Sequence, residues 1–231
     1  MHFVINNFML KKIITADNSP TLYVPELNEH YHSVNGALQE SIHIFINAGL
    51  KHIQKENINI LEIGFGTGLN TVLTFSENKK LKKNIYYETI EKYPLSKDII
   101  EDLINNNFTE PEITEQIHQI PWEKEIMISD NFYLKKIKTD LKTYFPEHTF
   151  DLVYFDAFAP EKQPELWTEE IFKKIYDATK QNGILVTYSA KGIVKQALRA
   201  AGFIVKRLPG PIGKRHMIQA IKIISSDNFQ D

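Results

Sequence analysis

The sequence predicts an α/β fold with a largely parallel sheet, and three observations support this prediction. Apolar runs typical of buried strands alternate with segments of helical periodicity along the 231 residues. One apolar run breaks into a glycine-rich turn that continues directly as a helical pattern. The last two expected strands follow each other across a Pro- and Gly-rich turn, which predicts an antiparallel hairpin at one edge of the sheet.

The composition is that of an ordinary globular protein. Hydrophobic residues make up 42% of the chain and charged residues 24%. No apolar run approaches the length of a membrane span, and the first residues lack a signal-peptide pattern. The chain has no cysteine, which excludes disulfides, thiolate metal sites and cysteine nucleophiles. We expect a cytoplasmic protein with no metal site and no membrane attachment.

Positive charge is concentrated late in the chain. The net charge is −2, but residues 191–222 hold eight Lys and Arg and no Asp or Glu, so the remainder carries −10. A basic segment on an acidic molecule can form a local anion-binding face. A solvated helix and hairpin whose charges point in several directions would explain the pattern equally well.

Residues 1–57 are expected to form an extension that packs on the core. Within it, residues 8–27 alternate like a β-hairpin, and residues 37–53 have a helical period. Between them, residues 26–36 are rich in His, Tyr, Asn and Glu, a composition that suits the wall of a functional site. A surface loop with satisfied polar groups is the competing interpretation of this segment.

A strand, a glycine turn and a helix form the first unit of the expected sheet. The strand 58–63 ends in a turn that contains Gly64, Gly66 and Gly68, where a ligand can approach the main chain closely. The G-x-G-x-G spacing differs from the dinucleotide pattern G-x-G-x-x-G, and no Lys and Ser/Thr follow as in a phosphate loop. With Glu62 two positions before the first glycine, the pattern resembles motif I of the Rossmann-like S-adenosylmethionine-dependent methyltransferases. A turn that serves only packing is the alternative.

The second expected strand, 84–91, carries two candidate carboxylates. Glu91 closes the strand and can accept hydrogen bonds from both ribose hydroxyls of a nucleoside ligand. Glu88 lies nearer the usual separation of about twenty residues from the glycines. We prefer Glu91, because ligands bind at the carboxyl ends of the strands in such sheets.

The segment that follows is longer than an ordinary crossover. Residues 95–139 are expected to form an insertion, with a helix over 95–103, breaks in the chain at Pro111 and Pro121, and a hairpin around 129–131. Asp140 follows a short strand and would face the adenine side of a ligand.

The remaining elements complete a seven-stranded sheet whose last strand is antiparallel. Strand 150–156 ends at Asp156, beside the crevice where the strand order reverses. The further expected elements are a helix at 169–179 stopped by Asn182-Gly183, a strand at 184–188, a helix at 191–201, and hairpin strands at 203–208 and 217–224. The methyltransferase-like domain would therefore span 58–224, and 225–231 would be a C-terminal tail.

Several segments together resemble a more specific family, the methyltransferase half of the MnmC proteins, bifunctional enzymes that modify the wobble uridine of tRNA. The segments are 64–70, 91–95, 155–167 and 213–217. The resemblance runs from about residue 8 to residue 222, and its most specific block is Asp-x-Phe-Ala-Pro followed by Pro-Glu-Leu-Trp. The chain departs from the family at Ala157, where Gly is frequent, and at His216, where Glu is frequent.

The resemblance implies an enzyme that methylates the primary amine of 5-aminomethyl-uridine, often 2-thiolated, at the tRNA wobble position. S-adenosylmethionine would supply the methyl group, and the product would be the 5-methylaminomethyl nucleoside. The anticodon stem-loop of tRNA would be the partner. The family's FAD-dependent half, which exposes this amine, has no room in the chain, so a separate FAD-dependent oxidoreductase is expected to act upstream.

Site residues follow from the strand ends and from the resemblance. Asp156 is the expected catalytic residue, because it could hold the incoming ammonium and receive or relay its proton; a cap on the next turn is the alternative. The expected cofactor-binding residues are Glu40, Glu62, Gly64, Gly66, Thr67, Gly68, Glu91 and Asp140. The expected tRNA-binding residues are Lys191, Lys214 and Arg215 for phosphates and Phe158, Trp167 and Tyr188 for stacking on a base, although each aromatic could instead belong to the core.

Two rival functions are compatible with the same fold. A small-molecule amine N-methyltransferase, or an aminopropyltransferase of the spermidine synthase type, would not need the basic stretch at 191–222. A non-catalytic RNA-binding protein could have lost Asp156 and Glu91, and both are present.

Overall fold

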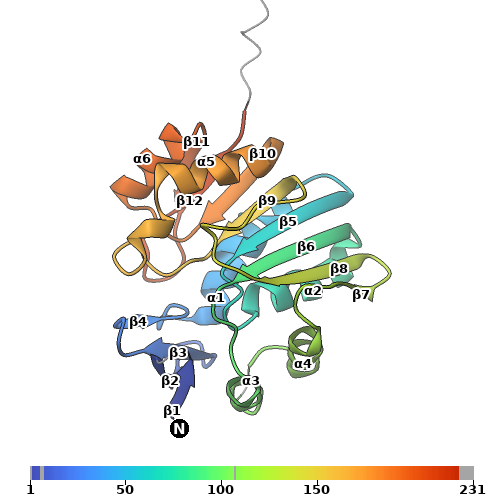
Figure 1. Cartoon of the computed structure of the whole chain (residues 1–231), viewed down its shortest axis with the longest axis vertical. Helices are drawn as coiled ribbons and strands as arrows, with labels where there is room; N and C mark the ends of the chain where they lie inside the picture. The colour runs from blue at the N-terminus through green and yellow to red at the C-terminus, as the bar shows by residue number, and fades with distance from the viewer. Residues whose placement is uncertain (1, 6–7, 107, 224–231) are drawn as a thin grey trace, which may run out of the picture.

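A computed structural model describes residues 2–5, 8–106 and 108–223, and within them the centre of the molecule is an eight-stranded sheet (Figure 1). Its strands are β5 (Asn57–Ile63), β6 (Asn84–Glu91), β7 (Glu125–Ser129), β8 (Phe132–Lys138), β9 (Phe150–Phe155), β10 (Thr179–Thr187), β11 (Ile204–Pro209) and β12 (His216–Ile221). Their order is β11-β12-β10-β9-β5-β6-β8-β7. The expected α/β fold with an antiparallel last strand is confirmed, with one strand more than the seven expected.

Parallel pairing runs through the middle of the sheet. Strands β8, β6, β5, β9 and β10 pair in parallel, whereas β12 is antiparallel to both β10 and β11. The additional strand is β7, which pairs antiparallel with β8 at the opposite edge. Because β8 lies parallel to β6, part of the segment 95–139 completes the sheet.

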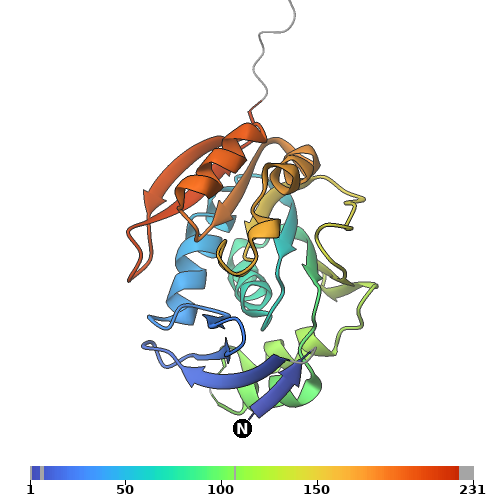
Figure 2. The ribbon, with the colours of Figure 1, turned by 60° about the vertical axis from the view of Figure 1, so that its left-hand side comes forward.

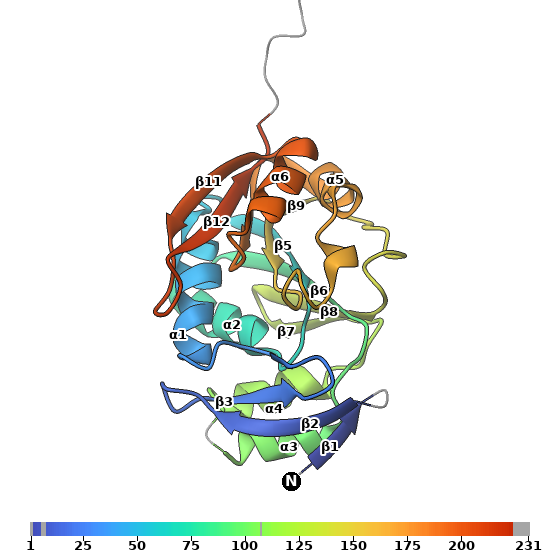
Figure 3. The ribbon, with the colours of Figure 1, turned by 90° about the vertical axis from the view of Figure 1, so that its left-hand side faces the viewer.

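Helices cover both faces of the sheet. They are α1 (Ala37–Ser41), α2 (Leu69–Leu81), α3 (Lys97–Ile104), α4 (Pro111–Gln119), α5 (Glu169–Ala178) and α6 (Gly192–Ala200). Figure 3 shows α1 and α2 on one side of the strands and α5 and α6 on the other. Every residue of β9 is buried, and from Leu152 to Phe155 successive residues alternate between two hydrophobic clusters, with Tyr154 in one and Phe155 in the other. This is the period of two that a strand covered on both faces requires.

The N-terminal region forms a second, smaller sheet. Its described strands, β1 (His2–Ile5), β2 (Phe8–Ile14), β3 (Pro20–Val24) and β4 (Glu29–His30), pair in sequence order. The expected hairpin at 8–27 is β2 and β3, and the Asp17 carboxylate closes its turn by accepting from the Ser19 N–H at 3.1 Å. Figure 2 shows this sheet below the main one, beside α3 and α4. The expected helix at 37–53 begins as α1 and continues as a π-helical turn, Ile42–Asn47, and a 3₁₀ turn, Leu50–His52.

Two local expectations were wrong. Pro111 was expected to break the chain, but it is the first residue of α4, where a missing N–H leaves no helical hydrogen bond unmade. The pair Asn182-Gly183 does not stop α5, which ends at Ala178. It lies in an irregular part of β10, where Asn182 has φ 63° and donates to the Lys222 carbonyl at 2.9 Å.

The ends of the chain add two observations. The expected tail, 225–231, and the last residue of the expected strand 217–224 lie outside the described residues. In the ranges that are described, no helix is both long and apolar enough to cross a membrane.

Candidate active site

A cavity of about 530 Å³ opens at the carboxyl ends of β5, β6 and β9. In the sheet β5 lies between β6 and β9. The chain passes from β5 to β6 on one side and later crosses from β8 to β9 on the other, so this is the crevice where ligands bind in open α/β sheets. The N-terminal segment 29–34 closes one side of the cavity, which confirms the expectation that residues 26–36 form a site wall. Among the predicted site residues, the cavity is lined by Glu40, Gly64, Gly66, Glu91, Asp140, Asp156, Phe158, Tyr188 and Lys214.

The glycine turn passes so close to its neighbours that side chains would collide there. Gly64 has φ 91°, and a Cβ on it would lie 2.6 Å from the carbonyl oxygen of Asp156. Gly66 has φ 52°, and a Cβ on it would lie 3.2 Å from the ring of Tyr31. Both conformations are left-handed, where L side chains are strained. Glycine at these two positions therefore keeps the turn flush against the cavity.

The rest of the turn lies behind the cavity wall. Gly68 is the N-cap of α2, and Thr67 is buried, with its carbonyl accepting from His118 Nε2 at 2.9 Å. Burial lowers the pKa of His118 to about 4, so the ring is neutral at pH 7 and can donate this bond. Thr67 and Gly68 therefore support the glycine turn on the side that faces away from the cavity.

Glu91 and Glu88 occupy different environments, and this difference decides which of the two carboxylates can contact a ligand. Glu91 lines the cavity and accepts the N–H of Gly66 at 3.1 Å and of Tyr93 at 2.8 Å. Burial raises its pKa. Glu88 is buried within the sheet and accepts the hydroxyls of Tyr86 and Tyr144. Of the two, Glu91 is the carboxylate that can reach a ligand.

Asp140 reaches the cavity from the loop after β8. Its carboxylate accepts the Lys142 N–H at 2.9 Å and pairs with Lys92 at 2.9 Å. These partners outweigh its desolvation and hold the pKa of Asp140 below its usual value. The group is therefore a fixed anion at the edge of the site.

Asp156 follows β9 and faces a neighbour on α2. Its carboxylate accepts from Asn70 Nδ2 at 2.8 Å. Burial raises the pKa of Asp156 to about 7, against the opposing effect of this hydrogen bond. A carboxylate in this range can change protonation state at physiological pH, which suits a group that handles a proton.

Glu62 lies beneath the cavity, completely buried on β5. It accepts from Thr71 Oγ1 at 3.0 Å, and burial raises its pKa to about 8. Through this hydrogen bond, Glu62 connects β5 to the first turn of α2. Glu40, by contrast, reaches the cavity wall, accepts the Ser33 N–H at 3.0 Å and forms an ion pair with Lys214.

The three candidate stacking residues separate into core and cavity. Trp167 is only 4% exposed, packs against Phe155 and Phe172, and donates to the Phe158 carbonyl at 2.8 Å. It is a core residue and offers no free face to a base. Phe158 and Tyr188 do line the cavity. The expected set is thus reduced to two aromatics.

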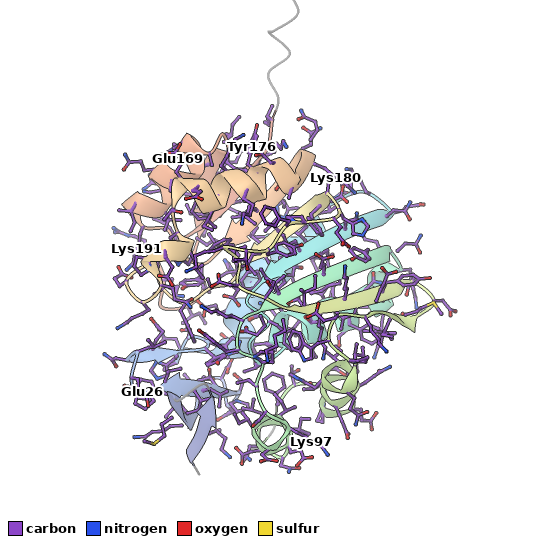
Figure 4. The ribbon with its side chains drawn as sticks, in the orientation of Figure 1. Glu26, Lys97, Glu169, Tyr176, Lys180 and Lys191 are labelled. Atoms are coloured by element: carbon purple, nitrogen blue, oxygen red, sulfur yellow. The ribbon has the colours of Figure 1, made fainter. Side chains whose placement is uncertain are left out.

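The basic candidates are also dispersed. Lys214 lines the cavity, whereas Lys191 is exposed on the outside of the molecule (Figure 4). There Lys191 forms an ion pair with Glu161. Arg215 lies beside His216 in a separate shallow pocket on the β11–β12 hairpin. The three side chains could meet one extended polyanion, but not one small ligand.

Two cavity residues were missed by the sequence analysis. Asn70 follows the glycine turn directly, but no role was assigned to it. Tyr31 lies edge-on to Phe158, with ring centroids 5.1 Å apart, and belongs to the segment already expected to form a wall. The signal for Asn70 was its place in the first turn of the helix after the glycines, where a side chain points back toward the strand ends.

Comparison with known proteins identifies the family. A family model described as S-adenosyl-L-methionine-dependent methyltransferase matches residues 96–223, more than half of the chain. Curated relatives named "tRNA 5-methylaminomethyl-2-thiouridine biosynthesis bifunctional protein MnmC" include one from Campylobacter hominis, 29% identical over 222 residues that cover 91% of this chain and 32% of the relative. Another, from Cupriavidus metallidurans, is 27% identical over 229 residues that cover 90% and 33%. The chain spans about a third of the length of the curated relatives that it matches.

Solved structures agree with this result. The crystal structure of MnmC2 from Aquifex aeolicus has a TM-score of 0.76 and 27% sequence identity, with 93% of this chain and 70% of that chain covered. Spermidine synthase from Thermotoga maritima has a TM-score of 0.62 at 17% identity, covering 96% and 72%, which is a likeness of fold. With a family match over more than half of its residues and a glycine-lined cavity at the strand ends, the chain belongs to the S-adenosyl-L-methionine-dependent methyltransferases.

Proposed function

We propose that this methyltransferase transfers a methyl group to the primary amine of 5-aminomethyl-(2-thio)uridine at the wobble position of tRNA, giving the 5-methylaminomethyl nucleoside. The observation that carries the proposal is Asp156, a carboxylate at the carboxyl end of β9 whose pKa burial raises to about 7. The names of the MnmC relatives, which refer to this nucleoside, support the same substrate.

The cavity residues fit the cofactor of the family. S-adenosylmethionine combines a ribose diol, an adenine amine, an α-ammonium and a sulfonium, so carboxylates and neutral acceptors suit it. Glu91 would accept from the ribose hydroxyls and Asp140 from the adenine amine, beside the backbone of Gly66. Among the described residues, buried Asn70 Oδ1 has no hydrogen-bond partner, and it is available to an ammonium group. The absence of a phosphate in this ligand agrees with a glycine turn that carries no lysine.

Asp156 would prepare the amine for transfer. When bound, S-adenosylmethionine would supply a methyl group on a positively charged sulfur: the lone pair of an amine can attack the methyl carbon while the S–CH₃ bond breaks and the sulfur leaves as the neutral thioether of S-adenosylhomocysteine. As a carboxylate, Asp156 would hold the substrate ammonium, accept its proton and leave the nitrogen lone pair free to form the new N–C bond. Positioning of this kind can contribute ~7–11 kcal/mol in favourable cases. Asn70 would fix the orientation of the carboxylate through its 2.8 Å hydrogen bond.

The proposal also covers the tRNA and an upstream reaction. Phe158 and Tyr188 would contact a splayed anticodon base, and Lys214, Lys191 and Arg215 would contact phosphates, which makes binding salt-dependent. An FAD-dependent oxidoreductase would expose the primary amine beforehand, and a tRNA substrate implies reaction in the cytoplasm.

The direct test is incubation of the protein with labelled S-adenosylmethionine and tRNA that carries or lacks the 5-aminomethyl group, followed by nucleoside analysis. We expect label only in 5-methylaminomethyl-(2-thio)uridine and only with the amine-bearing tRNA. Methylation of free polyamines but not of tRNA would favour a small-molecule enzyme of the same fold. Cofactor and tRNA binding without transfer to any amine would favour a non-catalytic RNA-binding protein.

A further inference from the structure

A lysine of the protein itself occupies a place in the cavity that suits a substrate amine. Lys214 Nζ forms an ion pair with Glu40 and lies 4.2 Å from the centroid of the Tyr188 ring. Glu40 and Tyr188 line the same cavity as Asp156. A carboxylate together with the face of an aromatic ring is a general recognition site for an alkylammonium.

The pair is coupled electrostatically to the catalytic carboxylate. Glu40 raises the pKa of Asp156 and Lys214 lowers it, although burial is the largest influence on that pKa. Glu40 is poorly solvated, because its side chain is only 11% exposed. If Lys214 left, Glu40 would lose its ion-pair partner and Asp156 would lose a nearby positive charge, so an incoming ammonium would be attracted there.

Lys214 can leave more readily than Glu40. Its side chain is 32% exposed, compared with the 11% of Glu40, and it belongs to the turn between β11 and β12 on the surface of the molecule. The preceding residue, Gly213, has φ 85° and packs on Asn35, so the turn lies against the residue that follows the N-terminal wall segment 29–34. The same long side chain that pairs with Glu40 can therefore reach toward solvent, where a tRNA phosphate would lie.

We infer that Lys214 occupies the binding site of the substrate amine in the free enzyme, where it pairs with Glu40 over the Tyr188 ring. When tRNA binds, Lys214 moves to a tRNA phosphate, and Glu40 and Tyr188 then bind the 5-aminomethyl ammonium. This inference rests on the proposed function. It makes Glu40 an amine-recognition residue, and it explains why the enzyme would prefer tRNA to a free amine. A free nucleoside has no phosphate, so it must displace Lys214 from Glu40 without the lysine–phosphate contact that tRNA would provide.

The test compares two substrates, an anticodon stem-loop that carries 5-aminomethyl-uridine and the free 5-aminomethyl-uridine nucleoside. For Lys214→Met we expect kcat/KM to rise several-fold on the nucleoside and to fall roughly tenfold on the stem-loop, the size of one lost charged contact. Adding Glu40→Gln should abolish the gain on the nucleoside. The matched control is Lys222→Met, because Lys222 also lies over a tyrosine, with Nζ 4.5 Å from the Tyr176 ring, but away from the cavity. That variant should leave both values unchanged.

A second measurement does not depend on turnover. Acetylation of Lys214 by an amine-reactive reagent, followed by mass spectrometry, should increase when the nucleoside and S-adenosylhomocysteine bind, because the lysine is displaced. A fall of kcat/KM on both substrates in Lys214→Met, or unchanged labelling with the nucleoside bound, would overturn the exchange. If the wild-type protein methylates neither substrate, the proposed function itself fails, and the labelling result still reports on the lysine.

Discussion

Replacing Asn70 by alanine tests whether Asp156 acts as an ionised carboxylate. The Asn70 side chain donates one hydrogen bond to Asp156, at 2.8 Å, and this bond lowers the pKa of a carboxyl group that burial has raised to about 7. Without the donor, the charged form loses stabilisation while the neutral form does not. The pKa of Asp156 should therefore rise further.

The size of the shift follows from the contact that is removed. A hydrogen bond to a charged group contributes about 1.5–3 kcal/mol, and one pKa unit corresponds to about 1.4 kcal/mol. Water that enters the space will recover part of the loss, so we expect an increase of about one unit. The acid limb of the kcat/KM profile should move from about pH 7 in the wild type to about pH 8.

The assay is methyl transfer to the amine-bearing stem-loop at saturating S-adenosylmethionine, measured from about 1.5 pH units below the wild-type inflection to about 1.5 units above that of the variant. The position of the inflection reports the pKa, and the height of the plateau reports any other loss. The matched control is Asn78→Ala, on the same helix and equally buried, because Asn78 bonds to the Lys83 backbone away from the cavity. It should lower stability without moving the inflection.

One result would refute the reasoning. If Asn70→Ala is folded and its acid limb coincides with that of the wild type, the rate-controlling ionisation does not belong to Asp156. The same conclusion would follow if Asp156→Asn kept the wild-type inflection.

Three further predictions concern the cofactor site, the aromatic residues and stability. Glu91→Gln should weaken binding of S-adenosylmethionine by about 10- to 100-fold in calorimetry, whereas Glu88→Gln should leave the affinity unchanged, and equal effects would contradict the assignment. Trp167→Ala should cost ~3–5 kcal/mol in denaturant unfolding because Trp167 lies in the core, whereas Phe158→Ala should mainly raise the KM for the stem-loop. The pKa of Asp156 is about 7 in the folded state and about 3.8 in the unfolded state, so the folded state binds more protons between pH 3.8 and pH 7. The free energy of unfolding of the wild type should therefore fall, relative to that of Asp156→Asn, as the pH rises from 3.8 to 7. Parallel stability curves would show that this carboxyl does not titrate as described.

Local patterns predicted most of the sheet and the centre of the site. The expected strand at 84–91 is β6 to the residue, and the glycine turn between 63 and 69 lies where the sequence places it. These predictions succeed because alternation, burial on both faces and glycine turns are properties of a few neighbouring residues. The prediction for Pro111 was wrong because it also used only neighbouring residues, and these do not distinguish a proline that breaks the chain from one that begins a helix.

The sequence by itself determined the α/β class, the glycine turn and the carboxylates at the ends of the strands, because parallel strands bring their carboxyl ends to one edge. Only the tertiary structure decided that Trp167 belongs to the core, that Tyr144 donates its hydroxyl to the buried Glu88, and that Lys214 pairs with Glu40. Each of these depends on segments far apart in the chain meeting in space. Burial and ion pairing are set by those neighbours, which a local pattern does not contain.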